Sequence, residues 1–213
     1  TSDLRLGRAG LVRLAASTPP AMALVPQVLA EFRARHPDIL LRSHVAPLAS
    51  MVSMLRAGDV ALAMALDDRL PPDIEVETLC QTGFCCILPE ADELNVQEAI
   101  SFADLDERNV ISYRSDTRPY EELVLTARTH GMKFSTQIEI DTSISAVGFV
   151  QAGLGIAIVD DLLPWHQFPG IVVRPLSQKA MLPLSLLVLK NKVLSRAEEL
   201  MRAQIRAICT ERP

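Results

Sequence analysis

Two pairs of hydroxyl side chains stand where the sequence predicts that a helix begins. Ser17 and Thr18 follow an apolar segment and precede Pro19, a residue type that a helix tolerates in its first turn. Thr142 and Ser143 precede a second predicted helix in the same way. Because hydroxyls and free backbone N–H groups at a helix N-terminus favour anions such as carboxylates, all five residues are candidate ligand contacts. Helix capping without any ligand explains the same residues, and both interpretations stay open.

Acidic side chains also occur in pairs, each directly after an apolar run that predicts a buried strand. Ligands of α/β sheets bind at the carboxyl ends of parallel strands, so Asp67, Asp160 and Tyr113 join the candidate site. A carboxylate there favours a ligand with a positively charged group, and Asp160 is the leading candidate for that contact. The alternatives are that each acidic pair is a solvated turn, and that Asp160 turns outward and caps residues 161–165.

The remaining chemistry-bearing residues show no catalytic or metal-binding pattern. The four cysteines lack a C-x-x-C spacing, the four histidines lack metal-ligand spacing, and no G-x-S-x-G segment surrounds Ser17. Gly153 and Gly155 resemble part of a dinucleotide motif, but the third glycine is missing and they follow a helix. We therefore expect no metal, no cofactor and no catalytic residue. Cysteines on apolar strands are typical of reduced core thiols, which predicts a cytoplasmic protein.

The composition places these candidates in a folded, acidic protein. The 213 residues are 49% hydrophobic and 22% charged, which excludes disorder and suffices for one large domain or two small ones. A formal net charge of −5 argues against nucleic-acid binding by this chain itself. No apolar run reaches the roughly 18 residues that a membrane-spanning helix needs, so no membrane contact is expected.

Strand and helix patterns alternate along the chain, and this alternation predicts an α/β fold. The strands are expected over residues 11–16, 39–45, 60–66, 74–79, 84–88, 110–113, 136–140, 155–159, 171–173 and 184–190. The helices are expected from about residue 21 to 36, over 50–57, 101–105, 120–130 and 141–151, and after residue 195. Ser195 and Glu198 have the spacing of a capping box at the start of the last helix.

The strand and helix pattern occurs twice, which predicts two Rossmann-like lobes with largely parallel sheets and helices on both faces. The last strand and helix return to the first lobe, so the chain crosses between the lobes near residues 84–88 and 184–190. We expect lobe I to comprise residues 11–85 and 188–213, and lobe II to comprise residues 86–187. Two crossover strands form a hinge, as in periplasmic binding proteins, and a small ligand is expected in the cleft between the lobes.

Four segments resemble, in order, the effector-binding domain of LysR-type transcriptional regulators. Residues 14–37 show the apolar strand, the Ser/Thr pair and the helix with an internal Leu-x-Pro that are typical of the family. Residues 55–60 (LRAGDV) and 150–159 (VQAGLGIAIV) resemble two later signatures, and residues 84–89 resemble the crossover strand. The resemblance therefore extends over nearly the whole chain.

Two positions depart from the family pattern. Members often carry Asp where this chain has Ala61, and many carry Pro where it has Asp160. In the family, the position of Asp160 lies at the cleft between the lobes, and a carboxylate there favours an effector with a positive group. The chain also resembles the branch that senses opines and basic amino acids more than the branch that senses aromatic acids.

The resemblance implies a sensor rather than an enzyme. It implies an amino-acid-like or opine effector and homodimers or tetramers. It also implies DNA contact only through a winged helix-turn-helix domain upstream, of which residues 1–10 are the linker remnant. A solute-binding protein of an amino acid transporter is the main alternative, although the adjacent free Cys85 and Cys86 argue against an oxidising periplasm. A third alternative is an enzyme that acts on a small molecule in the same cleft.

Overall fold

The computed structural model describes residues 10–210, so the predicted linker over residues 1–10 lies outside the described residues except for Gly10. The chain forms two compact units, each with its own sheet. Of the described residues, the first unit contains 10–80 and 183–210, and the second contains 81–182. Because each unit combines strands with helices, the predicted α/β fold of two lobes is confirmed.

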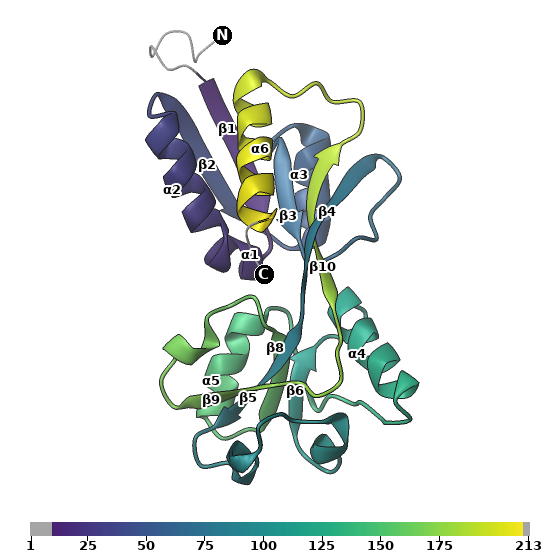
Figure 1. Ribbon diagram of the computed structural model, residues 1–213. Helices are drawn as coiled ribbons and strands as arrows, with labels where there is room; N and C mark the ends of the chain where they lie inside the picture. The colour runs from purple at the N-terminus through teal and green to yellow at the C-terminus, as the bar shows by residue number, and fades with distance from the viewer. Residues whose placement is uncertain (1–9, 211–213) are drawn as a thin grey trace. The chain divides into compact units, whose positions relative to one another are not determined.

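The first unit contains a five-stranded sheet in the order β2-β1-β3-β10-β4 (Figure 1). Its strands are β1 (Gly10–Ala16), β2 (Ile39–Val45), β3 (Leu62–Ala65), β4 (Ile74–Thr82) and β10 (Leu182–Leu189). Strand β1 pairs in parallel with β2 and β3, whereas β10 pairs antiparallel with β3. All four residues of β3 are buried, as expected for a strand at the centre of a sheet with both faces covered.

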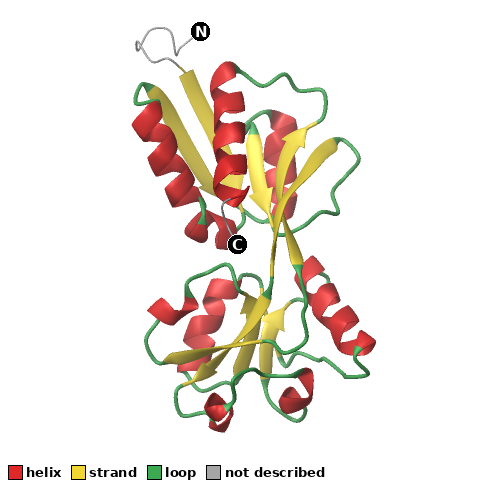
Figure 2. Cartoon of the chain, in the orientation of Figure 1, coloured by secondary structure: helices red, strands yellow, loops and turns green. Residues whose placement is uncertain are grey.

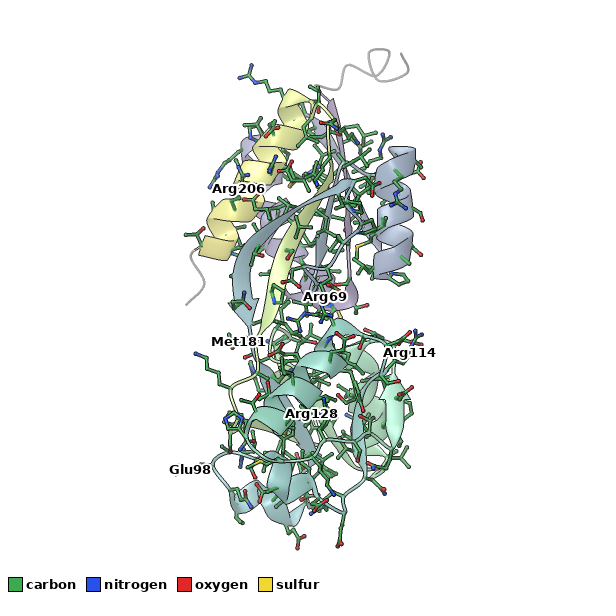
Figure 3. All side chains as sticks on the ribbon, turned by 90° about the vertical axis from the view of Figure 1, so that its right-hand side faces the viewer. Arg69, Glu98, Arg114, Arg128, Met181 and Arg206 are labelled. Carbon is green, nitrogen blue, oxygen red and sulfur yellow. The ribbon has the colours of Figure 1, made fainter. Side chains whose placement is uncertain are left out.

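Helices cover both faces of the first sheet. They are α1 (Thr18–Ala23), α2 (Val25–Arg35), α3 (Leu48–Ala57) and α6 (Arg196–Thr210). Figure 3 shows the strands between α6 on one side and α3 on the other. Met51 and Leu55 of α3 pack against Ala63 of β3, and all three residues are fully buried. Gly58 ends α3 with a φ of 75°, a left-handed conformation that a residue with a side chain adopts only at a cost.

The single helix predicted from about residue 21 is instead two helices. α1 begins at Thr18 and ends at Ala23, and α2 begins at Val25, with Leu24 between them at φ −123° and ψ −48°. Pro26 has no N–H to donate to the preceding turn, so one continuous helix would lack a hydrogen bond at this point. The break places Pro26 in the first turn of α2, where an N–H is not needed.

The second unit contains a five-stranded sheet in the order β7-β6-β8-β5-β9. Its strands are β5 (Phe84–Pro89), β6 (Val110–Tyr113), β7 (Ile138–Ile140), β8 (Ile156–Asp160) and β9 (Ile171–Pro175). Helices α4 (Arg118–Thr129) and α5 (Ala146–Gln151) flank these strands (Figure 2). Single turns of 3₁₀ helix complete the unit: η2 (Glu93–Val96), η3 (Phe102–Leu105), η4 (Ser143–Ser145) and η5 (Trp165–Gln167).

Both sheets are mixed rather than largely parallel. In the second unit, β6 pairs in parallel with β7 and β8, but β5 pairs antiparallel with β8 and β9. The cause is the path of the chain. β5 and β10 are the strands that follow a crossing between the units, and each runs antiparallel to the strands that are joined by helices. The sequence pattern identified the strands, but antiparallel and parallel buried strands have the same apolar composition.

The compact units divide five residues before each predicted boundary. The predicted boundaries were after residues 85 and 187, and the units divide between Cys80 and Gln81 and between Leu182 and Pro183. We predicted a crossing between the units near residues 84–88. In the structure these residues form β5, which pairs with β8 and β9 of the second unit. The chain therefore crosses from the first unit to the second within β4 and returns within β10.

The cysteines and the apolar segments of the described chain agree with the sequence expectations. None of the four cysteines forms a disulfide, and three of them are buried. Burial raises the pKa of the Cys86 thiol well above its ordinary value, so that side chain is a neutral core group. No helix within residues 10–210 combines the length and the hydropathy that crossing a bilayer requires.

An ion-pair cluster fastens α6 to the edge strand of the first sheet. Glu77 of β4 accepts a hydrogen bond of 2.5 Å from Nε of Arg206 and one of 3.1 Å from Nη2 of Arg202 (Figure 3 labels Arg206). The Arg206 guanidinium holds the pKa of the Glu77 carboxyl below its ordinary value, against the opposing effect of burial. The predicted capping box at the start of α6 is also present, with reciprocal bonds between Ser195 and Glu198.

We predict that Glu77→Gln lowers the free energy of unfolding by about 1 kcal/mol at pH 7, because it removes the charge of a partly exposed carboxylate that accepts three hydrogen bonds from Arg206 and Arg202. A carboxyl with a depressed pKa stabilises the fold above its unfolded value of about 4.5, and this stabilisation is lost as the pH falls further. Urea unfolding between pH 3 and 7 measures both effects. Asp38→Asn, at an exposed residue, is the control, and an equal effect of both substitutions contradicts the prediction.

Candidate functional site

Ser17 lies at the start of α1 but does not cap it. Its backbone is extended, and its side chain makes no capping hydrogen bond. Its N–H donates to the carbonyl of Met64 at 2.9 Å, which fixes Ser17 beside the carboxyl end of β3. The Ser17 hydroxyl oxygen is buried and has no partner within residues 10–210. Simple capping therefore does not explain this hydroxyl.

The N-terminus of α1 offers fewer backbone donors than the sequence suggested. The first N–H within the helix comes from Ala21 and donates to Ser17 O at 3.0 Å. Pro19 and Pro20 occupy the positions before it and have no N–H. Thr18 is the one residue there whose N–H remains for a ligand, because that of Ser17 is used by Met64. The donors at this point that an anion could meet are therefore the Ser17 and Thr18 hydroxyls and the Thr18 N–H.

Asp67 is partly exposed and forms a local turn. Its Oδ1 accepts a hydrogen bond of 2.8 Å from the backbone N–H of Arg69. This contact is the usual way in which an Asp side chain stabilises a turn two residues ahead. Asp67 lies two residues beyond the end of β3. Its bond to Arg69 is the contact that the solvated-turn interpretation predicts.

Thr142 and Ser143 form a second site with unpartnered hydroxyls. Thr142 precedes η4, and neither Thr142 Oγ1 nor Ser143 Oγ has a hydrogen bond in the described part of the chain. Ser143 is fully buried. The turn is closed instead by Ser145, whose N–H and hydroxyl donate to Thr142 O at 3.1 and 2.7 Å. The helix predicted over 141–151 thus begins as this 3₁₀ turn, and its two leading hydroxyls are not used as caps.

Tyr113 and Asp160 form a buried pair across two parallel strands. The Tyr113 hydroxyl at the end of β6 donates to Asp160 Oδ2 at 2.8 Å and accepts from the Asp160 backbone N–H, also at 2.8 Å. The second carboxylate oxygen accepts from the N–H of Leu162 at 3.2 Å. The Asp160 carbonyl accepts a bond of 2.6 Å from the indole N–H of Trp165. Each polar atom of Asp160 therefore has a partner.

Burial dominates the titration of this pair. It raises the pKa of Asp160 above its ordinary value, while the hydroxyls of Ser143 and Tyr113 and the N–H of Leu162 favour the charged form. Burial, followed by the negative charge of Asp160, raises the pKa of Tyr113 well above its ordinary value. The dipole of the Ser143 hydroxyl thus lowers the pKa of both Asp160 and Tyr113, although this hydroxyl makes no hydrogen bond within residues 10–210.

The orientation of Asp160 excludes an outward-facing or solvent-exposed side chain. The side chain was expected either to meet a ligand or solvent, or to turn outward and cap residues 161–165. It is fully buried and turns toward β6, and its one contact with that segment is the N–H of Leu162. The reason is Tyr113, which supplies a hydroxyl at the end of the neighbouring strand.

Asp161 is a polar contact that the sequence did not single out. Its Oδ1 accepts hydrogen bonds from the hydroxyl of Thr82 at 2.5 Å and from the N–H of Gly83 at 2.8 Å. A Cβ atom at Gly83 would lie 2.7 Å from Asp161 Oδ2, so a side chain cannot be placed there without movement. The doubled aspartate after an apolar strand was the available signal, and the partners 78 and 79 residues away were not visible in the sequence.

One pocket of the second unit lies away from all of these residues. It has a volume of about 190 Å³ and includes Phe102, Arg108, Val110, Lys133 and Phe134 in its lining. Val110 begins β6 and Tyr113 ends it, so the pocket and the Tyr113–Asp160 pair lie at opposite ends of one strand. The pocket lining contains none of the eight predicted site residues.

Within residues 10–210, no three potential metal ligands lie close enough together to hold an ion.

Comparison with known proteins assigns the family. Residues 5–210 match the family described as the LysR substrate binding domain, and this match covers nearly the whole sequence. The chain therefore belongs to the LysR substrate-binding domain family. Members of this family are regulator domains rather than enzymes, in agreement with the expectation that the chain has no catalytic role.

Two regulators and one solved structure illustrate the similarity. The uncharacterized HTH-type transcriptional regulator YfeR of Shigella flexneri is 28% identical over 200 residues, which are 92% of this chain and 64% of that protein. The transcriptional activator protein LysR of Escherichia coli (strain K12) is 29% identical over 179 residues, 82% of this chain and 57% of that protein. The effector-binding domain of QuiR in complex with shikimate is 18% identical with a TM-score of 0.84, and the match covers 95% of this chain and 98% of that domain.

The lengths in these comparisons show what share of each relative the chain matches. The chain spans 64% and 57% of the two regulators it matches, but 98% of the isolated effector-binding domain. Its sequence therefore corresponds to a part of such a regulator, and at 18% identity the solved structure supports the fold alone.

We predict that Asp160→Asn changes how stability depends on pH. A carboxyl whose pKa is raised by folding stabilises the fold fully below its unfolded value of about 3.8, and this contribution is lost as the pH rises through the raised pKa. Asn has no proton to lose, so the stability difference between the two proteins should move in favour of the variant from pH 3 to pH 7. Urea unfolding measures it, with the exposed Asp106→Asn as control. A difference that does not vary with pH contradicts the assignment.

Proposed function

We propose that this chain is the effector-binding domain of a LysR-type transcriptional regulator and that its buried hydroxyls bind the effector. The observation that carries the proposal is that the Ser17, Thr142 and Ser143 oxygens are all buried without a hydrogen-bond partner in the described chain. A buried polar group without a partner costs roughly 1–3 kcal/mol. Each such group needs an explanation, and we propose a bound ligand as that explanation.

The positions of these hydroxyls support the same proposal. Ser17 directly follows β1, and Thr142 follows β7 after one intervening residue, so each belongs to the carboxyl edge of the parallel part of its sheet. Ligands of α/β sheets bind at this edge. Thr18, Pro19, Asp67, Tyr113 and Asp160 belong to the proposed site with them.

We propose further that the effector is an amino-acid-like molecule or an opine. Hydroxyls and the N–H of Thr18 are donors suited to a carboxylate, and Asp67 and Asp160 supply negative charge for a cationic group. Asp160 meets such a group by exchanging one of its present partners, Tyr113 or the Leu162 N–H, for the ligand. The structurally similar domain of QuiR binds shikimate, a carboxylate without a cationic group, so anions of that class form the second arm of the tests.

The remaining parts of the proposal concern the longer protein. Its relatives include a regulator of the HTH type, and the net charge of −5 agrees with DNA contact by another part of that protein. We propose a homodimer or tetramer in the cytoplasm, in which effector binding favours one conformation and thereby changes DNA binding. A ligand that stabilises the isolated chain at micromolar concentration is the first requirement of this account.

We predict that replacing Ser17 and Thr18 together with Ala weakens effector binding by about 2–4 kcal/mol, since two hydrogen bonds to a charged group are lost. A thermal-shift screen of amino acids, opines and aromatic acids identifies the ligand, and calorimetry then measures its affinity. At a hundredfold excess over its dissociation constant a ligand stabilises the fold by about 2.7 kcal/mol. Ser53→Ala, which removes an exposed hydroxyl of α3, should have no effect. Unchanged affinity in the double variant would reject these residues as contacts.

We predict that Asp160→Asn weakens cationic ligands ten- to a hundredfold and leaves uncharged or purely anionic analogues nearly unaffected. The reason is that a charge-assisted hydrogen bond contributes about 1.5–3 kcal/mol. Calorimetric titration with a matched pair of ligands, one with and one without the ammonium or guanidinium group, separates the two cases. An equal loss for both ligands means that Asp160 has a structural role only.

A further inference from the structure

The two aspartates that end β8 and follow it contact different parts of the second unit. Asp160 binds the hydroxyl of Tyr113 at the end of β6. Asp161 binds the hydroxyl of Thr82 and the N–H of Gly83, and its own N–H donates to Gly83 O at 3.1 Å. Two adjacent residues therefore join the proposed effector site to the segment between β4 and β5.

That segment is where the chain enters the second unit. The units divide between Cys80 and Gln81, so Thr82 and Gly83 are the second and third residues after the passage. The return passage lies between Leu182 and Pro183, and the carbonyl of Ala180 lies 3.8 Å from the position that a Cβ at Gly83 would take. Gly83 thus lies close to both connecting segments.

The contact of Asp161 with this segment is close and specific. The Thr82 residue is only 6% exposed, and its hydroxyl lies 2.5 Å from Asp161 Oδ1. A Cβ atom at Gly83 would lie only 2.7 Å from Asp161 Oδ2, so this close approach, and not a positive φ angle, favours glycine here. The bend between β4 and β5 is therefore arranged around one carboxylate.

We infer that residues 160 and 161 relay the state of the effector site to the segment that connects the two units. An effector that exchanges hydrogen bonds with Tyr113 or Asp160 moves the backbone that Asp160 shares with Asp161. Asp161 is then a positioning residue, which holds Thr82 and Gly83 in one arrangement. The regulatory meaning of the relay rests on the proposed function, whereas the mechanical link exists in the free chain and is tested there.

Hydrogen exchange of the Gly83 amide, followed by NMR in the ligand-free chain, measures the link directly. Asp161→Ala removes the acceptor of this amide, and Thr82→Val removes the neighbouring hydroxyl at nearly constant shape. Each should accelerate exchange at Gly83 roughly tenfold relative to the amides of Ile111 and Ile158 in the sheet. Thr82→Ser keeps the hydroxyl and should restore slow exchange.

Tyr113→Phe tests the relay itself. It removes the hydroxyl that binds Asp160 but keeps the ring, which contacts Phe84 with a centroid distance of 6.4 Å. Tyr113 makes no hydrogen bond to Gly83, and its ring contact with the neighbouring Phe84 is kept in this variant, so accelerated exchange at Gly83 is the effect expected from losing the hydrogen bonds between Tyr113 and Asp160. Ser101→Ala is the control, since it breaks the capping box of η3 in the same unit and should leave Gly83 unchanged.

The outcomes separate the parts of the inference. Accelerated exchange at Gly83 in Tyr113→Phe, Thr82→Val and Asp161→Ala, with Thr82→Ser and Ser101→Ala close to wild type, supports the relay. Unchanged exchange in Tyr113→Phe rejects it, even where the Asp161 contact is confirmed. A uniform acceleration over Gly83, Ile111 and Ile158 shows general destabilisation and also rejects it. Failure to find an effector alters none of these results, so it bears on the proposed function alone.

Discussion

A carboxylate without solvent must have hydrogen-bond donors, and at Asp160 this requirement organises the carboxyl edge of the second sheet. The Tyr113 hydroxyl and the Leu162 N–H supply the donors, and the Trp165 indole binds the carbonyl of the same residue. These bonds fix the end of β6 against the end of β8 and determine where the chain turns after the sheet. The neighbouring Asp161 then has its side chain directed to Thr82 and Gly83.

Because buried polar groups need hydrogen-bond partners, buried hydroxyls without a partner indicate where a further molecule could bind. Each polar atom of Asp160 has a hydrogen-bond partner, whereas the hydroxyl oxygens of Ser17, Thr142 and Ser143 are buried and make no hydrogen bond within residues 10–210, although the Ser143 hydroxyl lowers the pKa of Asp160. The unpaired groups are small and uncharged, so each carries a modest cost that a bound ligand or an ordered water removes. Membership in the LysR substrate-binding domain family agrees with an effector as the ligand. The proposal that an effector binds at these hydroxyls rests on this difference.

Much of the fold was predictable because its signals are local. Apolar runs such as residues 60–66 identify buried strands, Gly58 identifies the end of α3, and the spacing of Ser195 and Glu198 identifies the start of α6. The direction of β5 and the break at Leu24 were missed, since chain path and the lost N–H of Pro26 outweigh the periodic pattern. The hydrogen bond between Asp160 and Tyr113 was also not predicted, because Tyr113 lies 47 residues away in the sequence and on another strand.

The central claim is that the hydroxyls at the carboxyl edges of the two sheets bind a small effector. Chemical-shift mapping by ¹H–¹⁵N NMR tests it most directly, with the ligand taken from a screen of amino acids, opines and aromatic acids. The account predicts that saturating ligand shifts the amides of residues 17–18, 113, 142–143 and 160–162 more than the rest of the chain. Shifts confined to the pocket between Phe102 and Lys133, or spread evenly without a maximum at these residues, would contradict it.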